Sequence, residues 1–308
     1  MQTVILALEN INSDTSWDTR SAETDKSKGL EAMHKIAILS DIHGNVTALE
    51  AALKDAILAE VTDYWILGDL TMPGPGSSDL LKRLRNLPNV VFVKGNWEDF
   101  FLNTSAFDFD RPTDVYGARL AKYQLDHLSE EELAFIEELP QIVIKEVAGF
   151  EFLICHHLPH KNYGGDLWIS EKQENFDLLF ADHKSDVAVF GHSHHQLMRY
   201  SSEGQLILNP GSIYQSFFFW ENFKNNVSRA QYTIIEVDQN GIGNINFKKV
   251  DYDTKKEIAL AKARNLPYFE LYKDALETGR SYTHNKEVLE KVNAEHGYKE
   301  EVVKFFKR

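Results

Sequence analysis

Along the chain after Met33, continuous apolar runs alternate with stretches whose hydrophobic positions recur at helical spacing. Three continuous apolar runs are typical of strands covered on both faces, at residues 35–40, 63–69 and 89–96. Apolar side chains at helical spacing predict a helix over 46–57 with Asn45 as its N-cap, and a second helix over 77–87. This order predicts an α/β fold that begins with a β-α-β unit.

The middle of the chain continues the alternation, and the last third changes character. Ser129 and Glu132 form a capping-box pattern, and a further helix is predicted near 170–182. The later strands are predicted at residues 141–148, 150–156, 186–195, 196–200, 205–209, 230–237 and 244–250, with an Asn240-Gly241 hairpin turn before the last. We interpret the strands of the last third as an antiparallel second sheet.

The same pattern divides the chain into three segments. Residues 1–32 lack a strong periodic signal, and we interpret them as a disordered tail or the by-product of an upstream start codon. Residues 33–252 form the predicted main domain, and residues 253–308 a helical appendage packed on it. Two roles stay open for the appendage, which are covering the site and forming a homodimer contact.

Composition narrows the range of partners. The 308 residues include 47 acidic and 33 basic ones, a formal net charge of -14, which argues against a large basic face for long nucleic acids. The single cysteine, Cys155, excludes an internal disulfide framework and fits a reducing compartment. No apolar run approaches the ~18 residues that span a bilayer, and the first residues do not resemble a signal peptide. We therefore predict a cytoplasmic protein without a membrane partner.

Polar side chains follow five of the predicted strands at the point where each strand ends. They are Asp41 with His43, Asp69, Asn96, His156 with His157, and His192 with His194. Taken singly, an aspartate at such a position is usually a turn former or helix cap, and a histidine a hydrogen-bonded surface group. Five strand ends together are hard to explain in that way. Because ligands gather outside the carboxyl ends of strands in α/β sheets, we predict one functional site here.

The residue types at these strand ends indicate metal binding. Asp41 and His43 are two residues apart, so in an extended strand they share one face, and the second histidine pair repeats this spacing. Carboxylate, imidazole and amide ligands together suit divalent Mn, Fe, Co or Zn, whereas Mg prefers oxygen ligands. Seven ligands are too many for one tetrahedral site, but they fit two metal ions about 3.5–4 Å apart that share a carboxylate and a hydroxide.

The blocks DIHGN, GD, GN, a lone strand-end histidine and GHSH resemble, in this order and spacing, those of the calcineurin-like metallophosphoesterases. The resemblance implies two mixed β-sheets flanked by helices for residues 33–252. It further implies a first metal held by Asp41, His43 and His194, and a second held by Asn96, His156 and His192, with Asp69 bridging the two. The implied cofactors are two divalent or trivalent transition metal ions, manganese or iron before zinc, cobalt or nickel. His156 is preferred to His157 because it directly ends its strand.

Trp97 departs from that family, many of whose members have a histidine directly after the Gly-Asn pair to protonate the leaving group. General-acid help matters when the departing oxygen is strongly basic. A phosphate leaving group has a second pKa of about 6 and can depart unprotonated. Trp97 therefore favours phosphoanhydrides or activated aryl phosphodiesters as substrates over phosphoproteins. His157 and His160 stay open as proton donors, and Trp97 either stacks on a nucleobase or packs in the core.

The stretches SDIHGN, GNWED, HHLPHKNYGG, NPGSIYQSFF and LPYFELY together resemble the bacterial asymmetrical diadenosine tetraphosphate hydrolases, which also act as phosphodiesterases. The resemblance begins near Met33 and continues almost to the C-terminus. It implies a nucleotide substrate, cleaved to AMP and ATP by the hydroxide between the metals. The predicted catalytic residues are Asp69, Asn96 and His157, and the predicted substrate contacts are Asn45, Trp97, His157, Lys161 and Arg199.

Two other functions stay open. One is a general metallophosphodiesterase that acts on short or cyclic nucleotides. The other is a binding scaffold on the same fold, as in relatives whose metal sites are degraded. All seven ligand positions of this chain carry competent side chains, which argues against the scaffold.

Overall fold

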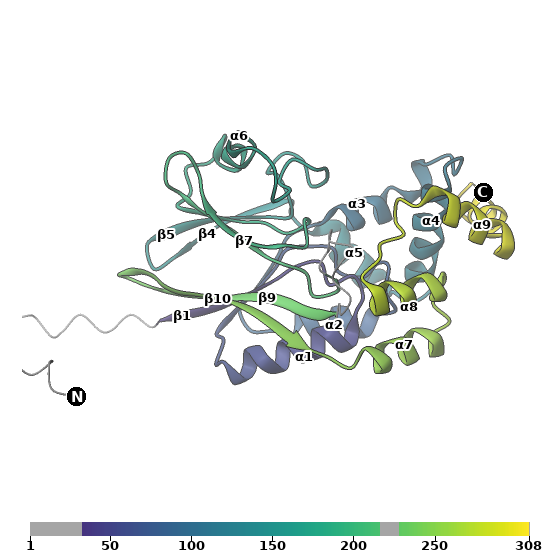
Figure 1. Cartoon of the computed structure of the whole chain (residues 1–308), viewed down its shortest axis with the longest axis horizontal. Coiled ribbons are helices and arrows are strands. Elements are labelled where there is room, and N and C mark those ends of the chain that lie inside the picture. Colours follow the sequence, from purple (N-terminus) through teal and green to yellow (C-terminus); the bar gives the residue numbers. More distant parts are fainter. Residues whose placement is uncertain (1–32, 216–227, 308) are drawn as a thin grey trace, which may run out of the picture. The chain divides into compact units, whose positions relative to one another are not determined.

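The computed structural model describes residues 33–215 and 228–307. The predicted tail, 1–32, and part of the aromatic stretch, 216–227, lie outside the described residues. The described part contains two five-stranded sheets, and helices pack on both (Figure 1). Both sheets are mixed, which confirms the predicted fold class.

The first sheet has the strand order β10-β9-β1-β2-β3. Its strands are β1 (His34–Leu39), β2 (Asp63–Ile66), β3 (Val90–Phe92), β9 (Arg229–Asp238) and β10 (Gly241–Asp251). The first three are parallel, and helices α1 (Val46–Leu58) and α2 (Ser78–Arg85) connect them. The Asn45 side chain accepts a hydrogen bond from the amide of Ala48, so it caps α1 as predicted.

The second sheet has the order β4-β5-β6-β8-β7. Its strands are β4 (Ile142–Val147), β5 (Phe150–Cys155), β6 (Val187–Val189), β7 (Gln196–Tyr200) and β8 (Leu206–Pro210). The three central strands are parallel, and the two edge strands pair antiparallel to their neighbours. The helix predicted near 170–182 consists of α6 (Gln173–Asp177) and a 3₁₀ turn (Leu178–Phe180).

The prediction of an antiparallel second sheet built from the last third of the chain is wrong. Strands β9 and β10 belong to the first sheet, where β9 pairs antiparallel with β1. The physical reason is that both faces of β9 are buried, which requires an apolar layer above and below it. The backbone of β9 pairs with β1 on one side and with β10 on the other. Hydrophobic periodicity identifies such a strand but does not say which sheet it joins.

Alternate side chains of each strand point to opposite faces of its sheet. The result is three apolar layers, one between the two sheets and one on the outer face of each sheet. Ile36, Ile38 and Trp65 of the first sheet pack against Phe152 and Ile154 of the second, which forms the core between the sheets. The opposite face of the first sheet is covered by α1 and α2, and the outer face of the second by α6.

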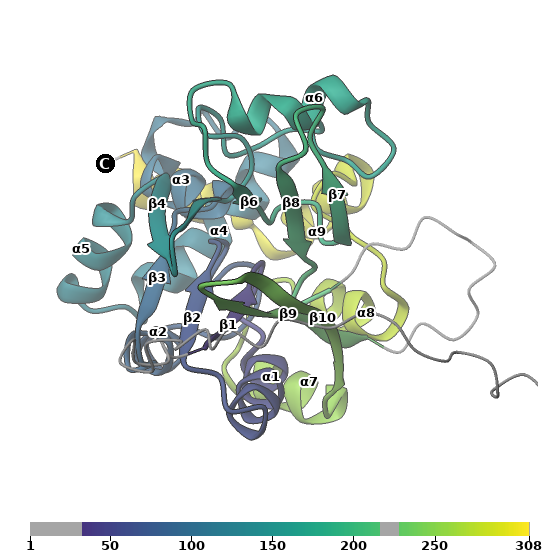
Figure 2. The same cartoon turned by 90° about the vertical axis from the view of Figure 1, so that its left-hand side faces the viewer.

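Further helices follow β3 and β10. They are α3 (Asn96–Leu102), α4 (Pro112–Leu125), α5 (Glu130–Glu138), α7 (Thr254–Ala263), α8 (Phe269–Thr278), α9 (Lys286–His296) and α10 (Tyr298–Phe306), with a 3₁₀ turn at Thr104–Ala106. Ser129 and Glu132 form the predicted capping box of α5. Helix α7 lies beside α1 (Figure 2), and Tyr272 and Leu276 of α8 join the apolar cluster that contains α1. Among the described residues, no helix has both the length and the apolar character to cross a membrane.

Candidate metal centre

The polar residues predicted at the strand ends come together in one buried centre. Asp41 and His43 follow β1, Asp69 follows β2, Asn96 begins α3 after β3, His156 follows β5, and His192 and His194 follow β6. We call these seven residues the candidate centre. Six of them form two groups of three, whose ligand atoms lie within 4.8 Å of one another in each group.

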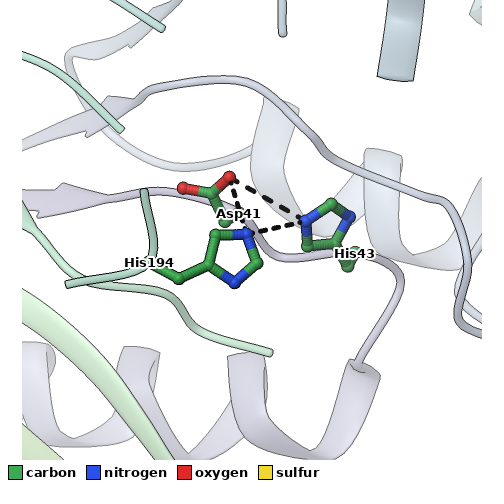
Figure 3. Close-up of side chains that lie close together, drawn as sticks. All are labelled: Asp41, His43 and His194. Carbon is green, nitrogen blue, oxygen red and sulfur yellow. Dashed lines mark hydrogen bonds and ion pairs between the residues drawn. The ribbon is translucent and has the colours of Figure 1, made fainter. Parts of the chain in front are cut away.

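The first group contains Asp41, His43 and His194 (Figure 3). The Nε2 atom of His194 lies 3.2 Å from Oδ1 of Asp41 and 3.2 Å from Nε2 of His43. The His43 Nε2 atom lies 3.8 Å from the same carboxylate oxygen. All three side chains are buried, so their polar atoms face one another away from bulk water.

The second group contains Asp69, His156 and His192, to which Asn96 adds an amide oxygen. The Asn96 Oδ1 atom lies 3.0 Å from Nε2 of His156 and 2.8 Å from Nδ1 of His192. The Asp69 Oδ2 atom lies 3.4 Å from His156 Nε2 and 3.6 Å from His43 Nε2. One oxygen of Asp69 therefore faces both groups, as a bridging ligand must.

Each carboxylate has one oxygen fixed by the protein and one directed into the centre. Oδ2 of Asp41 accepts hydrogen bonds from Ser40 Oγ at 2.6 Å and from the His192 amide at 2.9 Å. Oδ1 of Asp69 accepts one from the Trp97 amide at 2.9 Å. In the described part of the chain, Oδ1 of Asp41 is buried and has no hydrogen-bond partner. Since a buried carboxylate oxygen without a partner is costly, it fits a bound cation.

Backbone carbonyls orient the four histidine rings. Nδ1 of His43, His156 and His194 donates to the carbonyls of Met72, Leu67 and Gln215 respectively, and Nε2 of His192 donates to that of Gly164. A carbonyl oxygen can only accept, so the proton of each neutral ring is on the nitrogen that faces it. The other nitrogen then directs a lone pair at the centre, as is typical of histidines that bind metals.

Five of the seven residues of the candidate centre have left-handed backbone. Asp41, His43, Asp69, His192 and His194 have φ values of 52, 49, 54, 62 and 56°. The prediction that paired ligands share the face of an extended strand is therefore wrong, since β1 ends at Leu39 and β6 at Val189. The turn between the two histidines after β6 instead sends them to different groups. Such backbone costs about 1–2 kcal/mol per residue, so the surrounding contacts must hold it.

The charges of the centre favour a buried cation. Burial by itself would raise the pKa of Asp41, but the neighbouring histidines, His194 first, hold it well below its ordinary value. Burial lowers the pKa of His156, yet without a metal ion the carboxylates of Asp69 and Asp41 outweigh it and raise this pKa to about 10. The two carboxylates therefore attract positive charge, which a bound metal ion would supply in place of the ring proton. With its mixed set of oxygen and nitrogen donors, the centre thus fits two transition metal ions.

Glu98 is a residue of this site that the sequence reasoning missed. Its buried carboxylate accepts hydrogen bonds from the amides of Asp69 at 2.8 Å, Leu70 at 2.8 Å and Gly95 at 2.9 Å. Burial and the Asp69 charge raise the pKa of Glu98 to about 7, and the three amides oppose this shift. Glu98 thereby joins the loop that carries Asp69 to the loop that carries Asn96.

A sequence signal for this role was present. Residues 95–98 fit the pattern of a helix N-cap followed three residues later by glutamate. The sequence pattern predicts a strand over 89–96 with Asn96 at its end. Instead β3 ends at Phe92, Gly95 is the N-cap of α3, and Asn96 is the first residue of that helix.

The two loops approach so closely that position 95 admits only glycine. A Cβ atom on Gly95 would lie 2.2 Å from Oδ1 of Asp69 and 2.4 Å from its amide nitrogen. We expect Gly95→Ala to displace Asp69 and to lower the affinity for Mn²⁺ about tenfold in a metal titration. Gly243→Ala is the matched control, because its Cβ would meet nothing closer than Glu236 O at 3.9 Å. Equal metal affinities of the two variants would contradict the expectation.

Trp97 lies at the border between the centre and the apolar core. Its indole is partly buried, packs against the core cluster, and meets the His43 ring edge-on at 5.9 Å between centroids. It also contacts the rings of Phe100 and Tyr116. These contacts favour packing over a free platform for a base. An indole has no proton to give to a leaving group near neutral pH.

His157 and Lys161 lie beside the second group, and each has a protein partner. The His157 ring is buried 4.8 Å from the ring of His192, and its Nε2 lies 3.4 Å from Oδ2 of Asp166. Burial, followed by the nearby His192, lowers the pKa of His157 to about 3. Lys161 donates to the same Asp166 oxygen at 2.8 Å. We therefore do not retain His157 as a proton donor, and Lys161 stays a candidate phosphate contact.

Asn45 and Arg199 are not brought into the centre. Asn45 is buried, and its amide nitrogen donates to Tyr252 Oη at 3.1 Å while its oxygen caps α1. Arg199 donates to Gln173 at 2.6 Å and lies over the Phe176 ring at 3.7 Å, both on the α6 side of the second sheet. We leave both residues out of the proposed substrate contacts, because these partners occupy them elsewhere.

The two mixed sheets carry this set of donors where their strands end. The fold and the donors together define the class of the protein, which is an α/β protein with a candidate dinuclear metal centre. The chain belongs to the calcineurin-like phosphoesterase superfamily, since the profile of that superfamily's domain matches residues 34–239. It is 27% identical over 246 residues to the uncharacterized protein MJ0912 of Methanocaldococcus jannaschii, covering 75% of this chain and 93% of that protein.

A shorter similarity connects the chain to the symmetrical bis(5'-nucleosyl)-tetraphosphatase of Salmonella paratyphi C. The two are 31% identical over 114 residues, which cover 35% of this chain and 40% of that enzyme. Among solved structures, the hypothetical protein PH1004 from Pyrococcus horikoshii has a TM-score of 0.64 at 20% identity, covering 80% of this chain and 99% of that one. A metallophosphoesterase from Sphaerobacter thermophilus has a TM-score of 0.62 at 24% identity, with the same coverage. These two structures show the fold.

Proposed function

We propose that this chain is a two-metal hydrolase of dinucleoside polyphosphates, which cleaves diadenosine tetraphosphate to AMP and ATP and has a side phosphodiesterase activity. The main support for the proposal is the position of Trp97 beside His43. An enzyme that releases a strongly basic leaving group would need a proton donor at this position. The partial similarity to a bis(5'-nucleosyl)-tetraphosphatase supports the substrate class.

The residues of the centre have different roles in such a reaction. Two bound metal ions, proposed to be manganese or iron, would supply a nucleophile from water and positive charge for the phosphoryl oxygens. Asp41, His43 and His194 would hold one ion, and Asn96, His156 and His192 the other, with Asp69 between them. The hydrogen bonds that fix one oxygen of each aspartate keep the remaining oxygens in place without substrate.

The protons of the centre favour a leaving group that departs unprotonated. Each of its four histidines has a ring N–H committed to a backbone carbonyl. A departing phosphate has a second pKa of about 6 and needs no proton near neutral pH. Hydrolysis breaks the bond between the first and second phosphates of diadenosine tetraphosphate. One product, AMP or ATP, takes the oxygen of water, the other departs as a phosphate with the bridging oxygen, and the protons of water pass to the solvent near neutral pH.

A general metallophosphodiesterase is the second candidate, because activated aryl leaving groups also depart without a proton. A protein phosphatase is disfavoured for the reason that it would need an acid at position 97. The net charge of -14 is compatible with short nucleotides held by metal ions. A reducing, cytoplasmic location for such an enzyme stays a prediction from the sequence.

Product analysis tests the proposed function. Full-length enzyme loaded with Mn²⁺ is incubated with diadenosine tetraphosphate, and the products are separated by ion-exchange chromatography. We expect AMP and ATP in equal amounts, and no products when a chelator is present. Two ADP molecules would retain the metal mechanism and contradict the asymmetric cut. Cleavage of an aryl phosphodiester without turnover of the tetraphosphate would select the second candidate.

A further inference from the structure

Helix α7 places a buried carboxylate against the first turn of α1, the helix that directly follows the His43 loop. Glu257 is 0% exposed, and its Oε2 accepts a hydrogen bond from the Thr47 amide at 2.8 Å. Its Oε1 accepts one from Tyr272 Oη of α8 at 3.1 Å. A hydrogen-bond acceptor at this end of α1 is favourable, because the first amides of a helix have no partner within it.

A second contact from α8 reaches His43 through an aromatic stack. The rings of Tyr272 and Tyr214 are parallel within 5°, with 5.7 Å between their centroids. The Tyr214 ring in turn meets His43 edge-on at 5.6 Å. The amide of Tyr214 also donates to the carbonyl of Asp41 at 3.1 Å. The α8 helix thus supports the residue that packs on both ligands of the β1 loop.

A third contact comes from the segment between β10 and α7. Tyr252 Oη accepts a hydrogen bond from Asn45 Nδ2 at 3.1 Å and donates to Ser228 Oγ at 3.0 Å. Asn45 is two residues beyond His43, and its other amide atom caps α1. The loop after β1 and the first turn of α1 are therefore held at three points. Glu257 and Tyr252 contact them directly, and Tyr272 does so through Tyr214. Glu257, Tyr252 and Tyr272 all lie outside the 34–239 span that matches the superfamily domain.

We propose that helices α7 and α8 position the first metal group, and that Glu257 and Tyr272 are positioning residues for His43 and Asp41. This inference rests on the proposed two-metal function. The loop needs such support because Asp41 and His43 have left-handed backbone, with φ of 52 and 49°. Helices α7 and α8 thereby help to fix the geometry of the metal centre.

The chain offers a matched control for Glu257. Asn293 of α9 is also a buried polar side chain, accepts from Tyr268 Oη at 2.6 Å, and donates to the Pro112 carbonyl at the start of α4 at 3.1 Å. It therefore makes the same kinds of contact as Glu257, to one tyrosine hydroxyl and one backbone group in the first turn of another helix. Its contacts do not involve the His43 loop.

The test is a Mn²⁺ titration of full-length wild type, Glu257→Ala, Glu257→Gln and Asn293→Ala, followed by electron paramagnetic resonance and metal analysis. We expect Glu257→Ala to weaken one of the two Mn²⁺ sites about tenfold and to replace the signal of a coupled pair by that of a single ion. Asn293→Ala should retain the wild-type pair. Glu257→Gln should recover most of the affinity, because its amide oxygen can still accept from Thr47.

Identical Mn²⁺ binding by Glu257→Ala and Asn293→Ala would overturn the positioning role and leave the proposed function intact. Wild type that binds no Mn²⁺ and cleaves no phosphoester would overturn both. If Glu257→Ala does not fold, Tyr272→Leu provides the same comparison, since it removes the stack on Tyr214 and the hydroxyl that binds Glu257. Its expected result is again selective weakening of one of the two sites.

Discussion

Asp69→Asn is expected to lower kcat/KM for diadenosine tetraphosphate by at least about 10³-fold and to leave the fold intact. The asparagine keeps the size of the side chain, and its oxygen can still accept the hydrogen bond from the Trp97 amide. The atom that now faces His43 and His156 becomes an uncharged NH₂ group in place of an oxygen of a carboxylate. The centre then loses the carboxylate oxygen that we propose as the bridge between its two groups.

Metal analysis and product analysis of the same preparation check this expectation. Asp63→Asn is the matched control, because Asp63 is a buried aspartate of β2 whose side-chain partners, Thr62 and His34, lie outside the candidate centre. We expect its metal content and kcat/KM to stay within about twofold of wild type, as for changes remote from a site. An Asp69→Asn enzyme with wild-type turnover would exclude Asp69 as the bridging ligand.

Glu98→Gln is expected to weaken Mn²⁺ binding about 10²-fold, although Glu98 is not itself a ligand in our assignment. An amide NH₂ group would face one of the backbone amides of Asp69, Leu70 or Gly95, so that two donors meet. Leaving such a buried donor without an acceptor costs about 1–3 kcal/mol. The two loops would relax by moving apart, which separates Asp69 from Asn96.

Glu132→Gln separates this effect from general destabilisation. Glu132 is the glutamate of the other capping box, on α5, and it is 2% exposed compared with 3% for Glu98. Its partners Ser129, Ser78 and Lys82 lie outside the candidate centre. Thermal unfolding should show some loss of stability in both variants, while a Mn²⁺ titration should show a loss only in Glu98→Gln. Equal Mn²⁺ affinities of Glu98→Gln and Glu132→Gln would show that Glu98 only caps α3 and does not position the metal ligands.

Much of the candidate centre was predictable because strand ends are a local property. A run of apolar residues that stops at a polar one marks the end of a strand, and parallel strands end at the same edge of a sheet. This reasoning placed Asp69 and Asn96 together without knowledge of the pairing order. That His156, after β5 of the second sheet, joins them depends on the packing of the two sheets. The same reasoning failed for the loop conformation, because left-handed backbone at residues such as His43 leaves no trace in hydrophobic periodicity.

Three other features depended on contacts between segments far apart in the chain. The addition of β9 to the first sheet follows from its burial against β1, which lies about two hundred residues earlier. The support of the β1 loop by Glu257 depends on the docking of α7 beside α1. The placement of Arg199 over Phe176 depends on which face of the second sheet α6 covers.

The sequence by itself determined the α/β class, the strands, the identity of the polar residues at their ends and the absence of a histidine at position 97. These are set by residue type and by spacing over a few positions. The tertiary structure decided which atom of each ligand faces the centre, which residues hold the loops, and that Tyr272 of α8 packs on Tyr214, which in turn meets His43. The physical reason is that orientation comes from hydrogen bonds and packing between distant segments, which exist only once both sheets have folded.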